Sequence, residues 1–177
     1  ASVAKVEIAD KGFCASKDTY YYGVKLHMIA ENREGTLPVP EYVGLSAASV
    51  HDLPALRQVS SSLLNCQLFG DKAYGDQGLE SDLKAKQGVE LLTPIKLQRG
   101  QNRLDLFQNI YSAQISRVRQ PIESFFNWLQ EKTGIQVASK VRSYKGLIVH
   151  VFGKLAAALL MLKPKLMLND KRETLKA

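Results

Sequence analysis

The chain has 177 residues, of which 45% are hydrophobic and 23% are charged, which predicts a folded core and excludes a disordered segment. Its two cysteines, Cys14 and Cys66, are too few for a disulfide framework or a cysteine zinc site and predict reduced thiols in a cytoplasmic protein. The net charge of +7 is uneven: residues 1–94 carry 9 Lys/Arg against 12 Asp/Glu, net −3, whereas residues 95–177 carry 15 against 5, net +10. This asymmetry predicts a polyanion-binding face in the C-terminal half.

The first third of the chain has the patterns of extended structure. Residues 3–9 alternate loosely and predict a short strand, and residues 10–18 read as a loop. Residues 19–30 are aromatic and β-branched, a turn follows at 32–35, and residues 36–46 form a second extended run that contains two prolines. These segments predict an antiparallel hairpin. The prolines, Pro38 and Pro40, confine its second strand to a sheet edge or mark the start of that strand, because proline has no backbone N–H to donate to a ladder.

Helical and extended patterns then alternate. A helix is predicted from His51 to about Leu64, with Asp52 as its cap, and an amphipathic helix over 76–87 that Gly88 ends. Buried strands are predicted over 66–70 and 89–95. Parallel strands joined by a helix, preceded by an antiparallel hairpin, predict an α/β fold with a mixed sheet flanked by helices.

The basic half is mainly helical by pattern. Apolar residues recur at helical spacing from Leu104 to Leu129, and Pro121 lies inside this pattern, so the helix must either kink there or restart after Gln120. Residues 145–162 predict a last, apolar helix. His150, Gly153 and Lys154 interrupt it, and the remaining apolar run is far shorter than the roughly 20 residues of a membrane span.

Asp71 is the first candidate for chemistry. It directly follows the strand predicted at 66–70 and opens the small loop Asp71-Lys72-Ala73-Tyr74-Gly75. Side chains at the carboxyl ends of parallel strands enter the crevice where α/β proteins place their sites. The alternative is an aspartate that only caps a turn or helix.

Glu123 is the second candidate. On a continuous helix it shares a face with Arg119, four residues earlier; if the helix restarts at Pro121, it falls in the first turn, where the helix dipole favours its ionised form. The alternative is a surface ion pair. Two carboxylates on separate elements beside a basic surface indicate a site for Mg²⁺, which prefers oxygen ligands and serves phosphoryl transfer.

Four blocks, in order, carry a family resemblance: residues 11–31, GLSAASVHDLPAL, FGDKAYGD and RQPIESFFNWL. Together they resemble the catalytic domain of DDE transposases of bacterial insertion sequences, which has a ribonuclease-H-like fold, over residues 11–162. The resemblance implies DNA transposition by metal-dependent strand cleavage and strand transfer, with two Mg²⁺ or Mn²⁺ ions. It implies double-stranded DNA as partner, a homodimer, and a cytoplasmic, nucleoid-associated location.

The resemblance also implies site residues. Asp71 matches the second catalytic aspartate and Glu123 the catalytic glutamate, so both are expected to hold metal. Some of these families carry a Tyr-Arg-Glu-Lys signature around the glutamate. Here Arg119 is present, but Ser116 stands where the tyrosine would be, and Gln130 stands where the lysine would be, with Lys132 nearby.

The first catalytic aspartate of the family has no clear counterpart. Asp10 could take this role at the end of a first strand, although it lies later than the family pattern expects. The favoured expectation is that the true aspartate precedes Ala1. Residues 1–165 are then a catalytic domain with an incomplete first strand, and residues 166–177 form a basic tail.

Basic side chains of the chain are expected to contact DNA phosphates without reading sequence. These residues are Lys72, Lys96, Arg99, Arg103, Arg117, Arg119, Lys132, Lys140, Arg142 and Lys145. Two alternatives stay open: a catalytically inactive remnant that only binds DNA, and a nuclease of the same fold that acts on RNA–DNA hybrids.

Overall fold

The structure is a computed structural model that describes residues 6–14, 18–138 and 141–174, with side chains described as far as residue 162. The chain divides into two compact units. We call Asp10–Glu123 the central unit, and Ala1–Ala9 together with Ser124–Ala177 the terminal unit. Each is described by itself. Lys140, one of the predicted DNA contacts, lies outside the described residues.

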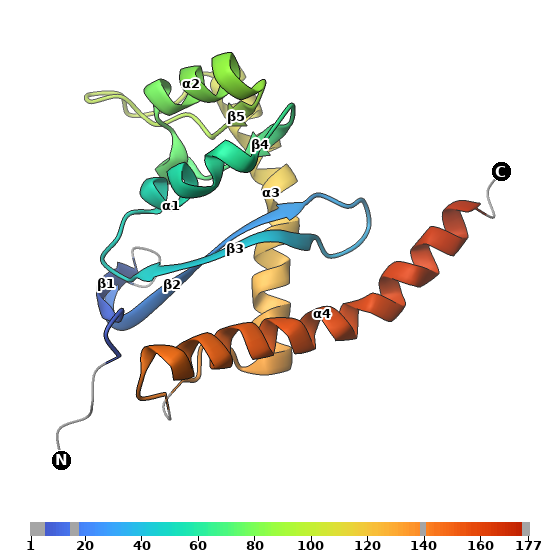
Figure 1. Ribbon diagram of the computed structural model, residues 1–177. Coiled ribbons are helices and arrows are strands. Elements are labelled where there is room, and N and C mark those ends of the chain that lie inside the picture. Colours follow the sequence, from blue (N-terminus) through green and yellow to red (C-terminus); the bar gives the residue numbers. More distant parts are fainter. Residues whose placement is uncertain (1–5, 15–17, 139–140, 175–177) are drawn as a thin grey trace. The chain divides into compact units, whose positions relative to one another are not determined.

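The central unit begins with a three-stranded antiparallel sheet, in the order β1 (Asp10–Cys14), β2 (Thr19–Glu31), β3 (Val39–Ala47), shown in Figure 1. The predicted hairpin is β2 and β3, which pair antiparallel. β3 lies at the edge of the sheet, as its prolines require, and the register shifts between Ile29 and Ala30, where Ala30 faces Pro40.

The segment predicted as a loop at 10–18 instead begins with strand β1, so this prediction was wrong. Gly12 explains the error, because glycine inside a short polar run reads as a loop signal. A Cβ atom on Gly12 would lie 2.7 Å from the Cβ atom of Ala48 and 2.8 Å from the ring of Tyr21. The glycine therefore allows close backbone packing. The preceding strand prediction also fails in its described part, because residues 6–9 form a turn closed by Ala9 N donating to Val6 O at 2.9 Å.

Helix α1 (Asp52–Val59) and the single turn η1 (Ser60–Ser62) follow the sheet. The predicted cap was wrong: His51 is the N-cap residue and makes no side-chain cap, and Asp52 is the first helical residue. The Asp52 carboxylate is directed to Lys25 instead. α1 contacts both β3 and the short helix η2 (Lys72–Tyr74), so it connects the sheet to the loop that carries Asp71.

The second half of the central unit is a strand–helix–strand unit. β4 (Gln67–Phe69) and β5 (Glu90–Leu92) pair in parallel as a separate two-stranded sheet, and α2 (Gln77–Gln87) connects them. Asp76 caps α2 by accepting from Leu79 N at 2.7 Å, and Gly88 ends it with φ 65°, as predicted. The core consists of the aliphatic side chains Leu56, Leu63, Leu79, Leu83, Val89 and Leu91.

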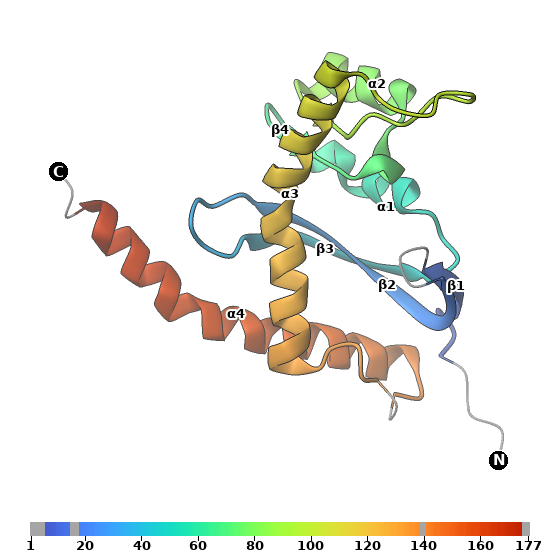
Figure 2. The ribbon, with the colours of Figure 1, turned by 180° about the vertical axis from the view of Figure 1, so that it is seen from behind.

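Helix α3 (Leu106–Thr133) runs without interruption through Pro121, as Figure 2 shows. Of the two alternatives predicted at Pro121, the restart after Gln120 does not occur, because proline removes one backbone hydrogen bond and the other bonds of a long helix remain. The helix begins with a reciprocal cap: Asp105 Oδ1 accepts from Gln108 N at 2.8 Å, and Gln108 Oε1 accepts from Asp105 N at 3.1 Å. Ser112 Oγ accepts from Ile95 N at 3.1 Å and ties this helix to the segment after β5.

The terminal unit contains the last part of α3 and helix α4 (Tyr144–Thr174), which continues beyond the predicted end at residue 162 and includes Pro164. One stripe of α4 is buried, with side chains at spacings of four, four, three and four: Leu147, Val151, Leu155, Ala158 and Leu162. The polar residues within the helix have partners, because Lys154 Nζ donates to Gly134 O at 2.9 Å and His150 Nε2 lies 2.9 Å from Ile135 O.

One segment of the described chain, Tyr144–Leu162, is long and apolar enough to cross a membrane by length and composition alone. These two properties are weak evidence, because the core helix of a soluble protein meets the same test. The α/β class predicted from the sequence is confirmed, with an antiparallel sheet, a parallel strand pair and helices. This combination is consistent with a ribonuclease-H-like fold.

Candidate active site

Asp71 lies where the sequence predicted it, directly after β4 and at the start of η2. Its Oδ1 atom accepts from Ala73 N at 2.7 Å, so the side chain does cap the short helix. Among the described residues, the second carboxylate oxygen makes no hydrogen bond. The capping bond therefore fixes the orientation of the side chain and leaves one oxygen for a ligand.

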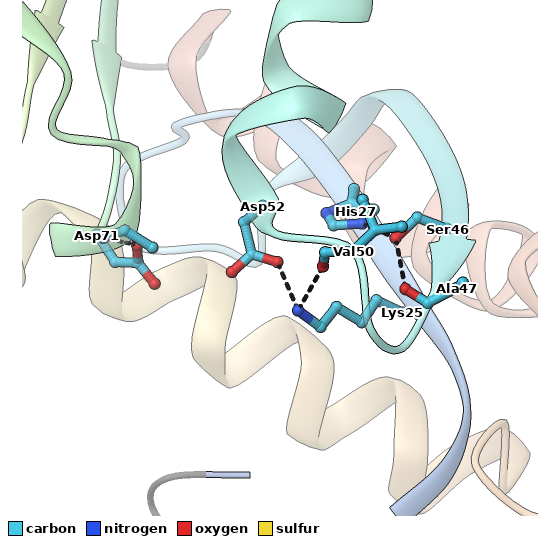
Figure 3. Close-up of polar contacts among 8 residues, drawn as sticks. Lys25, His27, Ser46, Ala47, Val50, Asp52 and Asp71 are labelled. Carbon is cyan, nitrogen blue, oxygen red and sulfur yellow. Dashed lines mark hydrogen bonds and ion pairs between the residues drawn. The ribbon is translucent and has the colours of Figure 1, made fainter. Parts of the chain in front are cut away.

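A second carboxylate, that of Asp52, lies in the same unit (Figure 3). Lys25 Nζ donates to Asp52 Oδ1 at 3.2 Å and to Val50 O at 2.8 Å, which joins β2 to the first turn of α1. His27, two residues along the strand, contacts Ser46 Oγ at 2.7 Å. Burial lowers the pKa of His27, the Asp52 carboxylate opposes this change, and the Lys25 ammonium adds to it.

Tyr74 connects these carboxylates with α3 electrostatically. Burial, together with the charges of Asp52 and Asp71, raises the pKa of Tyr74 to about 12, and the guanidinium of Arg119 opposes this change. Asp52, Asp71 and Arg119 belong to α1, to the junction of β4 and η2, and to α3, and their charges act on the same phenol. The tertiary structure therefore brings Asp71 and Arg119, 48 positions apart in the sequence, to one neighbourhood.

Glu123 is linked to this neighbourhood through Arg119. Arg119 Nη2 lies 3.6 Å from Glu123 Oε1, as expected for residues four apart on one continuous helix. The Arg119 side chain is 20% exposed and that of Glu123 is 62% exposed, so the carboxylate reaches solvent. Glu123 lies inside α3 and far from its first turn, so the helix dipole does not act on it as the alternative prediction required.

Asp10 begins β1 and does not end an earlier strand. Its Oδ1 atom accepts from Lys11 N at 2.7 Å, and its Oδ2 atom accepts from Ser49 Oγ at 2.8 Å. Both oxygens are therefore engaged within the sheet region. Its assignment as the first catalytic aspartate stays a prediction.

Two of the predicted DNA contacts lie at the loop that begins with Asp71: Lys72 within it and Lys96 in contact with its last residue, Gly75. Lys72 opens η2, and Lys96 Nζ donates to Gly75 O at 3.2 Å. Arg99, Arg103 and Arg117 are exposed in the central unit. The remaining described residues of the basic set are exposed in the terminal unit: Lys132, Arg142 and Lys145.

The sequence did not predict Lys25, Asp52 or Tyr74 as part of the site. Their only signal was position, because all three lie within the four blocks that carry the family resemblance. Within the described residues, no group of three or more His, Cys, Asp or Glu side chains is arranged to hold a metal ion.

Comparison with known proteins gives one match. A family model for the transposase DDE domain matches residues 3–160, which is most of the chain. No significant match was found among curated proteins or among solved structures. Domains of this family act on DNA as polynucleotidyl transferases or endonucleases and generally use divalent metal ions. On the sequence match and the α/β fold, this chain belongs to the transposase DDE domain family, whose function is DNA transposition.

Proposed function

We propose that this domain cleaves and joins DNA strands at transposon ends in a reaction that depends on divalent metal ions, with Asp71 and Glu123 as the metal-holding carboxylates. The observation that supports this most is the convergence around Tyr74. Asp71 and Arg119 both act on the Tyr74 phenol, and Arg119 is paired with Glu123. The two carboxylates assigned by family resemblance thus belong to one connected set of side chains.

The donors fit a hard cation in their chemistry. Both are carboxylates; Asp71 keeps one oxygen without a hydrogen bond among the described residues, and Glu123 is exposed. Mg²⁺ is usually held by one or two carboxylates, with waters and substrate phosphates as its other ligands, so two protein ligands are enough for binding. Asp71 and Glu123 would hold such an ion.

The other residues act on the DNA. When bound, a divalent ion would neutralise charge on the phosphodiester and activate the attacking oxygen. The basic side chains would position the DNA around it. Lys72, within the Asp71 loop, and Lys96, which contacts Gly75 of that loop, position the phosphate by charge-assisted hydrogen bonds. Arg119 orients the Glu123 carboxylate through their ion pair. Arg99 and Arg103, in the exposed loop before α3, hold the flanking duplex through its backbone.

The test uses isosteric changes. Asp71→Asn keeps an oxygen that accepts from Ala73 N, so the cap of η2 survives while the charge is lost. Glu123→Gln likewise removes the negative charge of Glu123 and keeps the size of its side chain. Each variant should lose the heat of Mg²⁺ binding in calorimetry and the nicking of supercoiled plasmid in Mg²⁺ or Mn²⁺. Asp76→Asn, at the cap of α2, is the matched control and should retain both. Plasmid nicking that survives Asp71→Asn or Glu123→Gln refutes the site.

A second candidate function is a DNA-binding remnant without catalysis. It is favoured by the lack, within the described residues, of any group of three metal-ligating side chains. The same titration separates the two candidates. A wild-type chain that binds duplex DNA but gives no heat with Mg²⁺ would be the remnant.

A further inference from the structure

Tyr74 is held in a fixed place beside Asp71. Its ring packs against the core of the central unit, and its backbone N–H donates to Asp71 O at 3.1 Å. A Cβ atom on Gly70 would lie 3.1 Å from the Cβ atom of Tyr74 and 3.2 Å from its Cδ2 atom. The ring therefore lies close to Gly70, the residue before Asp71.

The hydroxyl of Tyr74 has no hydrogen-bond partner among the residues that the structure describes. Within that same part of the chain, no fully buried side-chain oxygen or nitrogen lacks a partner, so this hydroxyl must be accessible to solvent. Tyr42, which packs on the same core, differs because its hydroxyl donates to Ser62 O at 3.3 Å. Tyr74 thus has a donor that is not fully buried and that no described residue uses.

The surroundings of this donor suit a phosphate oxygen. Lys72 is two residues away on η2, Lys96 reaches Gly75 O, and the Arg119 charge acts on the phenol itself. A tyrosine phenol is protonated at physiological pH and keeps its O–H group as a donor. A neutral donor next to Asp71 also adds no positive charge that would compete with a metal ion for the carboxylate.

We propose that Tyr74 is a substrate-contacting residue whose hydroxyl donates a hydrogen bond to a phosphate oxygen of the DNA strand bound beside Asp71. This inference rests on the proposed function and adds a residue to it. A hydrogen bond to a charged oxygen is worth enough to change affinity by about tenfold. Because the donor is uncharged, no counterion is released from the DNA when this contact forms. Its loss therefore leaves the salt dependence of binding unchanged.

The test is Tyr74→Phe, which keeps the ring and removes only the hydroxyl. Fluorescence anisotropy with a labelled 20-base-pair duplex in Mg²⁺ should show about tenfold weaker binding, an unchanged slope of log Kd against log salt, and an unchanged urea midpoint. Tyr42→Phe is the matched control and should bind as the wild type does. Wild-type affinity in Tyr74→Phe, a changed salt slope, or a wild-type chain that does not bind the duplex overturns the inference.

Failure here is distinguishable from failure of the metal site. If Asp71→Asn abolishes Mg²⁺ binding while Tyr74→Phe binds DNA normally, the proposed function stands and the Tyr74 contact is wrong. If Asp71→Asn retains Mg²⁺ binding while Tyr74→Phe weakens DNA binding tenfold, the phosphate contact stands and the assigned metal site is wrong.

Discussion

The ammonium of Lys25 lies 3.2 Å from the carboxylate of Asp52 and also donates to the Val50 carbonyl at 2.8 Å, so one side chain from β2 holds the entry to α1. Both side chains are largely shielded, with exposed fractions of 27% and 30%. Since α1 in turn contacts η2, this pair supports the loop that carries Asp71. The Lys25–Asp52 pair therefore supports the structure of the site and takes no part in the proposed chemistry.

Lys25→Met should therefore lower the free energy of unfolding by about 1–2 kcal/mol, because it leaves a partly shielded carboxylate and carbonyl without their donor. Urea unfolding followed by circular dichroism measures this. Lys86→Met is the control: its pair with Asp82 is about two-thirds exposed on both sides, and its loss should cost less than about 0.5 kcal/mol. Equal costs for the two variants would contradict the role given to Lys25.

His27 predicts a loss of stability in mild acid. Burial lowers its pKa in the folded chain below the ordinary value of 6.5, so the unfolded chain takes up a proton first as the pH falls. Its contribution to stability is complete above pH 6.5 and decreases as the pH falls through the folded-state pKa. The urea midpoint of the wild type should be lower at pH 5 than at pH 7.5, measured at about constant ionic strength.

His27→Gln should reduce this difference between the two pH values. His51→Gln, at the exposed N-cap position of α1, should keep it because His27 remains. An equal fall of the midpoint in His27→Gln and the wild type would show that other groups cause the acid sensitivity.

Gly70 should resist enlargement because of Tyr74. A Cβ atom there would meet the Tyr74 side chain at 3.1 Å and the Thr93 Cγ2 atom at 3.4 Å, so the neighbours must move by a few tenths of an ångström. Gly70→Ala is expected to cost about 1–2 kcal/mol of unfolding free energy, as overpacking does. In a Tyr74→Gly background, which removes both the Cβ and the Cδ2 atoms that crowd position 70, the same change should cost much less. A cost that is the same in both backgrounds would place the strain elsewhere.

If Arg99 and Arg103 contact DNA phosphates, part of the affinity for duplex DNA should depend on salt. If each contacts one phosphate, the double change to alanine should weaken duplex binding at low salt and reduce the slope of log Kd against log salt by roughly 2. Anisotropy between about 50 and 200 mM salt measures the slope. Lys84→Ala with Lys86→Ala, two exposed residues of α2, is the charge-matched control and should leave the slope as it is. A slope that is reduced only in the Lys84/Lys86 control would contradict the proposed contacts and would indicate that DNA binds at α2.

Several features could be predicted because their causes are local. The β2–β3 hairpin follows from aromatic and β-branched residues around a turn, and the end of α2 follows from a glycine at φ 65°. Asp71 could be placed at the end of a strand because a short apolar run stops there. The pairing of Arg119 with Glu123 was predictable from their spacing, since residues four apart share a helix face.

The sequence by itself thus determined the elements, the charge asymmetry and the two candidate carboxylates. Only the tertiary structure decided that 10–14 form a strand, because β1 exists through pairing with β2 and through the space that Gly12 leaves for Ala48. It also decided that α3 passes through Pro121 and that Asp52 pairs with Lys25 and does not cap its helix. Likewise, the proximity of Arg119 to Asp71 and Tyr74 depends on two separate elements, because Asp71 caps η2 and Tyr74 ends it, whereas Arg119 belongs to α3. Contacts between residues distant in the chain leave no periodicity in the sequence, so packing alone establishes them.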